Sequence, residues 1–380
     1  ATVWVSELVH QCPDVRVVVT SRERLGIAGE HVIQLDGLAS PEAGEVTARS
    51  DAVRLFTSRA REVDARFSCD DASARDIARI CSLVDGSPLG IELAATWVRV
   101  LSCADIAEEI AATLDFLSSD ARDATPRHRS MRAVLEHSWG LLRPAEQRVL
   151  SQLSVFRGGC SRESAAAVAG ADLRELAALV DRSLLRVATS EHGTRFEMHE
   201  LLRQFAAERL HASGEQEATR QRHAAHFVAV VRRCFPELRR SGQVEALRRI
   251  DVDDGNIVAA LEWTVAAGDY ATAARIGWPI WPFWWIRNRQ HEGRRLLDPV
   301  IAHADEVPIG HRIRVTIGIL AMAYGQGDTA AVARFAETLM GYAEQIGGDA
   351  GTEAFAHAGW GLVALMDGDA TTASRHLEQT

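Results

Sequence analysis

The sequence predicts a mostly α-helical chain with a partial α/β sheet near its start and an α-solenoid at its end. Three patterns support this prediction. A dense β-branched run at residues 15–19 ends in hydroxyl and guanidinium groups, short helices followed by a hairpin pattern occupy residues 130–213, and a Gly-Asp turn recurs three times after residue 214. Apolar residues elsewhere repeat mostly at helical spacing, so helices are expected to dominate.

The composition is that of an ordinary globular protein. The chain has 380 residues, of which 47% are hydrophobic and 25% charged, and this length suits two to four domains. No apolar run is long enough for a membrane span, and residues 1–9 lack the pattern of a signal peptide. The net charge of −10 disfavours bulk attraction to nucleic acid or to an anionic membrane. We therefore expect a cytoplasmic protein with no membrane partner.

Residue counts and spacings exclude several chemistries. All 42 Lys+Arg residues are arginine, so the sequence holds no GxxxxGK[ST] loop, no Schiff-base lysine and no lysine general base. The six cysteines form no CxxC pair, which favours reduced thiols over a disulfide framework or a zinc site. His199 begins a near match to HExxH that lacks the second histidine, and His223 and His226 have no acidic or thiol partner at an obvious spacing. No metal site is therefore expected.

The run at residues 15–19 is typical of a strand buried on both faces of a parallel sheet. Thr20, Arg22 and Arg24 would follow at its carboxyl end, the edge at which open α/β sheets bind ligands. Hydroxyl and guanidinium groups suit phosphate, so this edge is either a phosphate-sensing site or a solvated turn after a core strand. A second strand is expected at residues 31–35. Two strands are a fraction of such a sheet, so the chain is expected to begin inside an α/β domain.

Helical spacing predicts most of the remaining elements. Asp51 and Ser87 are expected as N-caps, and Pro88 as the first residue of its helix, where the missing N–H has no cost. Residues 118–129, rich in Ser, Asp, Arg and Pro, are expected to form a linker. Helices are predicted at 3–12, 51–63, 74–84, 88–101, 105–117, 130–142, 144–153, 161–169, 173–182 and 199–211.

The helices of residues 130–213 are followed by strand-like segments that turn at Gly193, a pattern that resembles a winged helix. The helix at 173–182 would be the element that enters a DNA major groove. Asp172, Glu175 and Asp181 balance its arginines, so its exposed face lacks the positive excess that phosphate contacts need. Direct DNA binding by this unit is therefore not expected.

Residues 214–380 are expected to be all helical. Gly-Asp turns begin at Gly268, Gly327 and Gly368, at intervals of 59 and 41 residues. Tetratricopeptide repeats have a period of about 34 residues, so the irregular spacing indicates a degenerate helical solenoid with insertions, which we expect to be truncated after Thr380. The tryptophan-rich run at 278–285 is either a ligand platform or, as we favour, a packing contact between helical units.

Several segments, in order, resemble the STAND (NB-ARC-like) signalling ATPases. Residues 17–22 (VVVTSR) are similar to the sensor strand of that family. Residues 86–89 (GSPL) resemble its GLPL motif with serine in place of the first leucine, and residues 198–200 (MHE) resemble its MHD motif with glutamate in place of aspartate. Residues 127–142 and 153–159 are similar to the linker and winged-helix opening of the bacterial branch. That branch contains actinobacterial transcriptional regulators of the antibiotic-regulatory and LuxR types.

The resemblance implies a domain order and a nucleotide site. The domains would be the C-terminal part of an NB-ARC-like ATPase domain (1–40), a helical ARC-like domain (41–125), a winged helix (126–213) and tetratricopeptide-like repeats (214–380). Arg22 would sense the γ-phosphate of ATP, Pro88 would pack on the adenine, and His199 would contact the β-phosphate of ADP and hold a closed state. The set implied to bind the cofactor is Thr20, Arg22, Arg24, Pro88 and His199.

The resemblance also implies what this chain does not do. The Walker A loop and the Walker B strand of the family would precede residue 1, and without them and the Mg²⁺ ligands hydrolysis cannot follow the usual route. We therefore expect this chain neither to hydrolyse ATP nor to bind ATP or ADP tightly. Nucleotide exchange in the intact protein would separate the domains, and the repeats would receive a protein or small-molecule effector and release self-association.

Three functions stay open. The first is part of an ATP/ADP-switched ATPase that regulates transcription. The second is a winged-helix regulator that reads DNA itself. The third is a repeat scaffold that binds a partner through residues 215–380 without nucleotide control.

Overall fold

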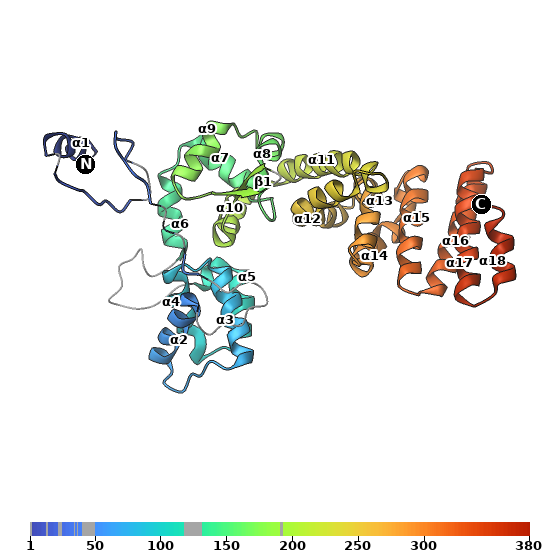
Figure 1. Ribbon diagram of the computed structural model, residues 1–380, viewed down its shortest axis with the longest axis horizontal. Coiled ribbons are helices and arrows are strands. Elements are labelled where there is room, and N and C mark those ends of the chain that lie inside the picture. The colour runs from blue at the N-terminus through green and yellow to red at the C-terminus, as the bar shows by residue number, and fades with distance from the viewer. Residues whose placement is uncertain are drawn as a thin grey trace. The chain divides into compact units, whose positions relative to one another are not determined.

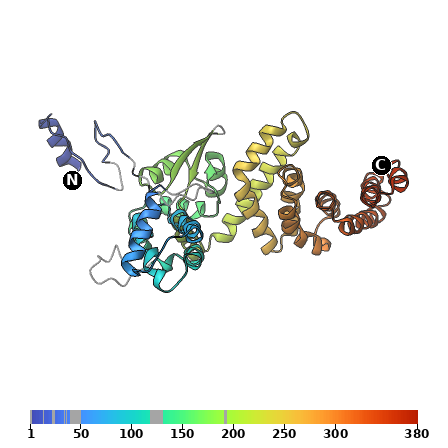
Figure 2. The same cartoon turned by 60° about the horizontal axis from the view of Figure 1, so that its bottom comes forward.

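The structure is a computed structural model that describes residues 2–12, 14–21, 25–33, 35, 37–39, 50–117, 131–190 and 193–380. The chain divides into two compact units (Figures 1 and 2). Unit 1 consists of Ala1–Val155 and Ser161–Gln216, and unit 2 of Phe156–Cys160 and Glu217–Thr380. No helix among the described residues has both the length and the apolar character that crossing a bilayer requires.

The first described segments hold one helix and no strand. Helix α1 (Thr2–Gln11) confirms the helix predicted at 3–12. The strands predicted at 15–19 and 31–35 are wrong for the residues that the structure describes there, which form no strand. Val18 is 93% exposed and Ile33 is 84% exposed. A strand needs a neighbour to take its backbone hydrogen bonds, and β-branched side chains alone do not supply one.

The next part of unit 1 is a small helical domain. Ser50 caps its first helix by accepting a hydrogen bond from Val53 N, so the predicted N-cap, Asp51, is one residue too late. Ser87 caps the helix that begins at Pro88, as predicted. That helix ends at Ala95 and continues as a 3₁₀ turn instead of reaching residue 101. The elements are α2 (Asp51–Val63), α3 (Asp71–Leu83), α4 (Pro88–Ala95), η1 (Thr96–Arg99), α5 (Cys103–Ala112) and η2 (Leu114–Phe116).

A winged helix completes unit 1. Strands β2 and β3 pair antiparallel, with Arg186 opposite Glu197, and the described sheet has the order β1-β3-β2. Leu150, Leu176 and Phe205 are fully buried between its helices. The elements are α6 (Met131–Gly140), α7 (Pro144–Leu153), β1 (Cys160–Ser161), α8 (Arg162–Ala169), α9 (Leu173–Asp181), β2 (Arg186–Ser190), β3 (Gly193–Glu197) and α10 (Glu200–Ala212). The predicted helices-then-hairpin order is confirmed.

Unit 2 is an array of helices in which consecutive helices from α15 to α18 pack against each other (Figure 1). Its elements are α11 (Gln216–Cys234), η4 (Glu237–Arg239), α12 (Gln243–Ala266), α13 (Tyr270–Ile286), α14 (Gln290–Ala302), η5 (Ala304–Glu306), α15 (Ile309–Gly325), α16 (Thr329–Gln345), α17 (Ala350–Met366) and α18 (Ala370–Leu377). The expectation of an all-helical region is confirmed.

The Gly-Asp turns each join two helices in the same way. Gly268, Gly327 and Gly368 have φ of 74°, 72° and 78°, a left-handed conformation that glycine adopts without strain. The aspartate that follows each glycine then accepts a backbone hydrogen bond from the first turn of the next helix. The turn therefore ends one helix and begins another. A fourth turn of this kind, at Gly348, was not predicted.

The domain boundaries implied by the family stay predictions. The boundaries after residues 40 and 125 lie outside the described residues, as does the linker expected at 118–129.

Candidate functional site

The turn between α3 and α4 has an unusual backbone. Asp85 and Gly86 both have positive φ, of 52° and 62°. Gly86 N donates a hydrogen bond to the carbonyl oxygen of Cys81 at 2.8 Å, which closes the end of α3. Leu38 N in turn donates to the carbonyl oxygen of Gly86 at 2.8 Å, and a Cβ at residue 86 would stand 2.1 Å from the carbonyl oxygen of Leu38. Only glycine permits this close approach of two backbone segments.

His199 stands at the start of α10, where its side chain caps the helix. Nδ1 accepts a hydrogen bond from Leu201 N at 3.0 Å, so the proton of the neutral ring is on Nε2. Nε2 lies 3.8 Å from an Oδ atom of Asp85. Burial lowers the pKa of His199, and the neighbouring Asp85 carboxylate only partly opposes this effect. A neutral imidazole with a fixed tautomer therefore faces the Asp85 turn.

Arg186, the first residue of β2, reaches the same carboxylate. Its guanidinium donates a hydrogen bond to Asp85 Oδ1 at 3.0 Å, and a second guanidinium nitrogen pairs with Oδ2. Asp85 thus receives two groups of the winged helix, one from the wing hairpin and one from the start of α10. We call Asp85, Arg186 and His199 the Asp85 junction.

A second set of polar contacts joins the helical domain to the winged helix within unit 1. Arg132 on α6 donates to Glu208 at 2.7 and 3.0 Å and pairs with Asp115 in η2. These carboxylates raise the pKa of Arg132 further above its usual range. Gln204 Nε2 donates to the carbonyl oxygen of Ala111 at 3.2 Å. The described contacts between the two domains are therefore rich in ion pairs and hydrogen bonds.

The structure brings two of the five predicted cofactor residues to one turn. Pro88 is exposed three residues after Asp85, and His199 contacts Asp85. Thr20 is exposed in a segment without regular structure, and among the described hydrogen bonds and ion pairs none joins it to Pro88 or His199. Arg22 and Arg24 lie outside the described residues.

Sequence reasoning missed Asp85 and Arg186. In the sequence Asp85 marks only the end of a helix, and its partner is 101 residues away. An acidic residue directly before the Gly-Ser-Pro segment was the one available signal.

His223 is a buried core residue of unit 2. Its ring lies 5.2 Å from that of Phe156 and 4.7 Å from that of Phe227, measured between centroids. Burial lowers its pKa to about 4.

The tryptophan-rich helix α13 serves mainly in packing. Trp284 is fully buried, and it lies so close to Gly293 on α14 that a Cβ there would stand 2.6 Å from its ring. The favoured interpretation of residues 278–285 as a packing contact between helical units is confirmed for Trp284. Trp281 and Trp285 also line a hollow in unit 2.

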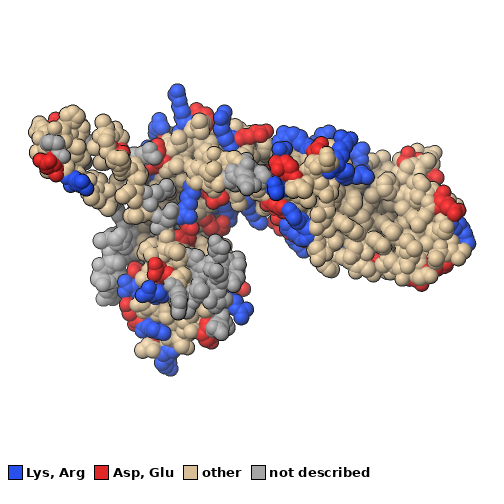
Figure 3. All heavy atoms as spheres, in the orientation of Figure 1, with Lys and Arg blue, Asp and Glu red and all other residues tan. Residues whose placement is uncertain are grey.

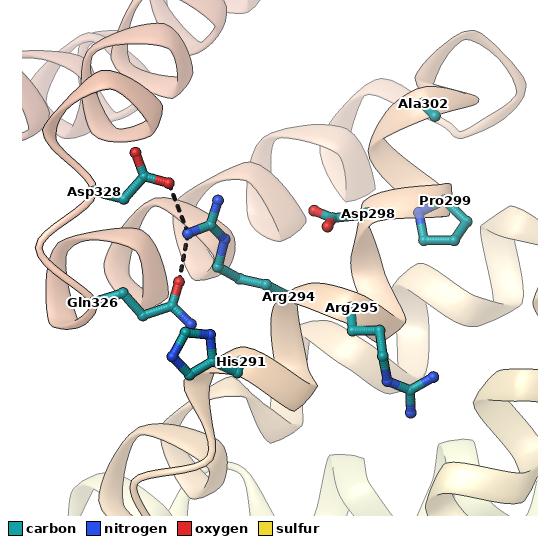
Figure 4. A pocket seen from close by; sticks show the side chains of 8 residues that line it. All are labelled: His291, Arg294, Arg295, Asp298, Pro299, Ala302, Gln326 and Asp328. Atoms are coloured by element: carbon teal, nitrogen blue, oxygen red, sulfur yellow. Dashed lines mark hydrogen bonds and ion pairs between the residues drawn. The ribbon is translucent and has the colours of Figure 1, made fainter.

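Unit 2 also contains a polar pocket of about 680 Å³ (Figure 4). Within it Arg294 donates hydrogen bonds to Gln326 and, at 3.0 Å, to Asp328, while Arg295 points away from both (Figure 4). The guanidinium of Arg294 is thus already held by partners. The pocket is lined by His291, Arg294, Arg295, Asp298, Pro299, Ala302, Gln326 and Asp328.

Comparison with known proteins supports the assignment of the central domain. Residues 142–211 match a family model described as a winged helix-turn-helix domain. Together with the observed fold, this match identifies that part of unit 1 as a winged helix-turn-helix domain.

Curated relatives extend the similarity over most of the chain. A protein named "Putative HTH-type transcriptional regulator" occurs in Mycobacterium tuberculosis and in Mycobacterium bovis, and is 29% identical over 326 residues, covering 84% of this chain and 35% of the relative. An uncharacterised protein of Mycobacterium tuberculosis is 30% identical over 231 residues, or 59% of this chain and 57% of the relative. The chain thus spans about a third of the length of the regulators that it resembles.

One solved structure is similar over 93% of this chain and 49% of its own length. It is a signal transduction ATPase with numerous domains (STAND) that has a tetratricopeptide repeat sensor, from Pyrococcus horikoshii. The identity is 15% and the TM-score is 0.36, which is too low to establish a common fold.

Proposed function

We propose that this chain is part of a nucleotide-switched transcriptional regulator of the STAND type, from the bacterial branch with a winged helix and tetratricopeptide-like repeats. In the whole protein, ADP would hold the winged helix against the helical domain, and exchange for ATP with Mg²⁺ would release it. The repeats would receive a protein or small-molecule effector, the active form would self-associate, and the protein would act in the cytoplasm. The similarity to transcriptional regulators over 84% of the chain supports this proposal.

The Asp85 junction is the observation that carries the proposal. One carboxylate on the α3–α4 turn holds both Arg186 and His199 of the winged helix. Because the side chains of this contact are partly exposed, water can solvate their charges when the contact breaks. A ligand that favours one arrangement can then shift the equilibrium between a joined and a separated state.

The nucleotide would lie beside this turn in the whole protein. Pro88 would pack on the adenine and His199 would contact the β-phosphate. Thr20, Arg22 and Arg24 would approach the terminal phosphates. A neutral histidine is compatible with this role because its N–H donates to phosphate without a charge.

The test is a transcription reporter driven by the whole protein, without added effector. If the junction restrains the protein, His199→Ala and Asp85→Ala each raise transcription severalfold. The matched control is His211→Ala, which changes an exposed histidine on the same helix, α10. Unchanged transcription in both junction variants, at wild-type protein levels, would contradict the proposal.

A winged-helix regulator that reads DNA itself is the second candidate, and the match of residues 142–211 to a winged helix-turn-helix model favours it. Against it, Asp172 and Glu175 form the capping box at the start of α9, where phosphate contacts would need positive charge. Gel shifts of the 380-residue chain at several salt concentrations distinguish the two. We expect no specific shift, whereas sequence-specific binding that weakens steeply with salt would establish the second candidate.

A further inference from the structure

Unit 2 contains an apolar hollow of about 500 Å³, distinct from the polar pocket of Figure 4. It lies among η4, the start of α12, and helices α13, α15, α16 and α17. Residues that matter for its chemistry are Arg239, Trp281, Trp285, Tyr324, Phe355 and Leu362. We call it the aromatic pocket. Nothing in the switch proposed for unit 1 uses it.

Two glycines on α15 shape the aromatic pocket. Trp281 and Trp285 are four residues apart, so they lie on one face of α13. A Cβ at Gly318 would stand 3.1 Å from the ring of Trp281, and a Cβ at Gly325 would stand 2.7 Å from that of Trp285. The indole rings can therefore lie directly on the backbone of α15. Trp285 also stacks on Tyr324, with an interplanar angle of 4°.

The pocket leaves apolar surface open to water. Among the residues that line it, Phe355 is 48% exposed, Ile286 is 41% exposed and Tyr324 is 36% exposed. Large apolar side chains that gather on an exposed concave surface mark binding sites. The volume of the pocket is in the range of small-molecule sites. A concave hollow of this size fits a small ligand better than it fits the flat surface of a partner protein.

One positively charged side chain, that of Arg239, lies at this apolar site. Arg239 lines the pocket, is exposed, and has no carboxylate partner among the described ion pairs. The contrast with the polar pocket is informative, because there Arg294 is bound by Asp328. The last turn of α11 adds Arg232 and Arg233 shortly before η4 in the sequence. Figure 3 shows arginine atoms gathered over the part of the chain where α11 and α12 lie.

We propose that the aromatic pocket binds a small amphipathic anion. The apolar body of the ligand lies on Trp281, Trp285 and Phe355, and its carboxylate is paired by the guanidinium of Arg239. Arginine suits this role because its planar donors match the two oxygens of a carboxylate. Arg239 places a positive charge at the pocket although the whole chain carries a net charge of −10.

This inference names the chemical class of the effector, and only that naming rests on the proposed function. Binding itself requires neither nucleotide nor DNA. A failed reporter experiment on the Asp85 junction would therefore leave the pocket untouched, and a failed binding experiment would leave the junction untouched.

The experiment is calorimetric titration of the 380-residue chain with three probes of equal chain length: dodecanoate, dodecan-1-ol and dodecyltrimethylammonium. We expect one dodecanoate per chain, weaker binding of the alcohol and no measurable binding of the cation. Arg239→Gln weakens dodecanoate about fivefold and leaves the alcohol unchanged, as removal of an exposed ion pair should. Phe355→Ala weakens both the acid and the alcohol.

Two control variants match these changes outside the pocket. Arg248→Gln removes an exposed arginine of α12, and Val244→Ala truncates an apolar residue that is 60% exposed. Both should bind dodecanoate like the wild type. The proposal is overturned if dodecanoate does not bind, or if Arg239→Gln and Arg248→Gln weaken it equally. It is also overturned if sedimentation shows a dimer that dissociates in the Phe355→Ala variant but stays intact in the presence of dodecanoate. A second copy of the chain would then fill the pocket.

Discussion

Asp85 combines an unusual backbone conformation with a carboxylate that two side chains share. It has a positive φ without being glycine, and its carboxylate is shared by Arg186 and His199. Aspartate tolerates the left-handed region better than most residues, yet the conformation still costs free energy. Residues held in this way concentrate at sites where a conformation is used. The strained residue is also one of those that join the helical domain to the winged helix, as Arg132 and Gln204 do.

His223 gives a prediction about pH. Burial lowers its pKa from the usual 6.5 to about 4, with smaller contributions from the charges of His226 and Arg220. Below pH 6.5 the unfolded chain therefore binds a proton that the folded chain does not, and stability falls as the pH falls. At pH 5 the loss from this residue is about 2 kcal/mol relative to pH 7.

Urea unfolding of the chain between pH 7.5 and 5 measures this loss. His223→Gln should flatten the pH dependence, whatever its effect at pH 7. The matched control is His291→Gln, which replaces an exposed histidine on α14. Equal slopes for the wild type and His223→Gln would show that folding does not lower the pKa of this histidine.

Two of the residues that sequence motifs identified, Pro88 and His199, lie near one turn, whereas Asp85 and Arg186 were missed. A motif marks residues whose type is unusual at that place, such as proline at a helix start. A pairing such as that of Arg186 with Asp85 depends on how two domains pack across 101 residues of sequence. Neither residue type is unusual in its own segment, so local pattern alone does not reveal the pair.

Elements were predictable where their signals are local. Ser87 with Pro88, and each Gly-Asp turn, fix a helix boundary through a cap that involves only neighbouring residues. The strand predicted at 15–19 failed because a strand depends on a partner that its own sequence does not contain. Predicted helix starts were wrong where the N-cap lies outside the apolar pattern. Asp70 caps α3, so this helix begins at Asp71 instead of at the predicted residue 74.

The contact between α13 and α14 predicts the effect of a single methyl group. Gly293 is buried on α14, and a Cβ there would stand 2.5 Å from Sδ of Met322 and 2.6 Å from the ring of Trp284. Both side chains are fully buried, so neither can move away freely. Gly293→Ala should lower the free energy of unfolding by about 1–3 kcal/mol, as overpacking does.

Gly341→Ala is the matched control for that substitution. Gly341 is exposed on α16, and a Cβ added there would meet nothing within 4 Å, so alanine should raise stability by about 1 kcal/mol through helix propensity. Urea unfolding of both variants gives the comparison. A Gly293→Ala protein as stable as Gly341→Ala would mean that the two helices can shift apart at little cost.

At the scale of the whole molecule, charge is distributed unevenly. The chain is acidic, yet the last turn of α11 carries two adjacent arginines, Arg232 and Arg233. Most of the ion pairs described in unit 2 join neighbouring helices or turns. In unit 1, the ion pairs Arg132–Asp115 and Arg186–Asp85 join the winged helix to the helical domain. The arginines at the end of α11 suit the attraction of an anion. The ion pairs between the two domains of unit 1 suit a reversible contact. Two separate inputs, a nucleotide near unit 1 and an anionic effector in unit 2, are consistent with these charges.

The last prediction concerns nucleotide binding by the 380-residue chain itself. Tight binding of ATP usually needs a loop of backbone amides and a lysine around the phosphates, and this sequence contains no lysine. Thr20 is exposed, and the described contacts do not link it to Pro88 or His199. Titration calorimetry with ADP and with Mg²⁺–ATP should therefore give no affinity in the micromolar range, in a sample whose circular dichroism confirms helical folding. Micromolar binding abolished by His199→Ala but not by His211→Ala would show that the Asp85 junction holds a nucleotide without a phosphate-binding lysine, and the switch would then reside in this chain alone.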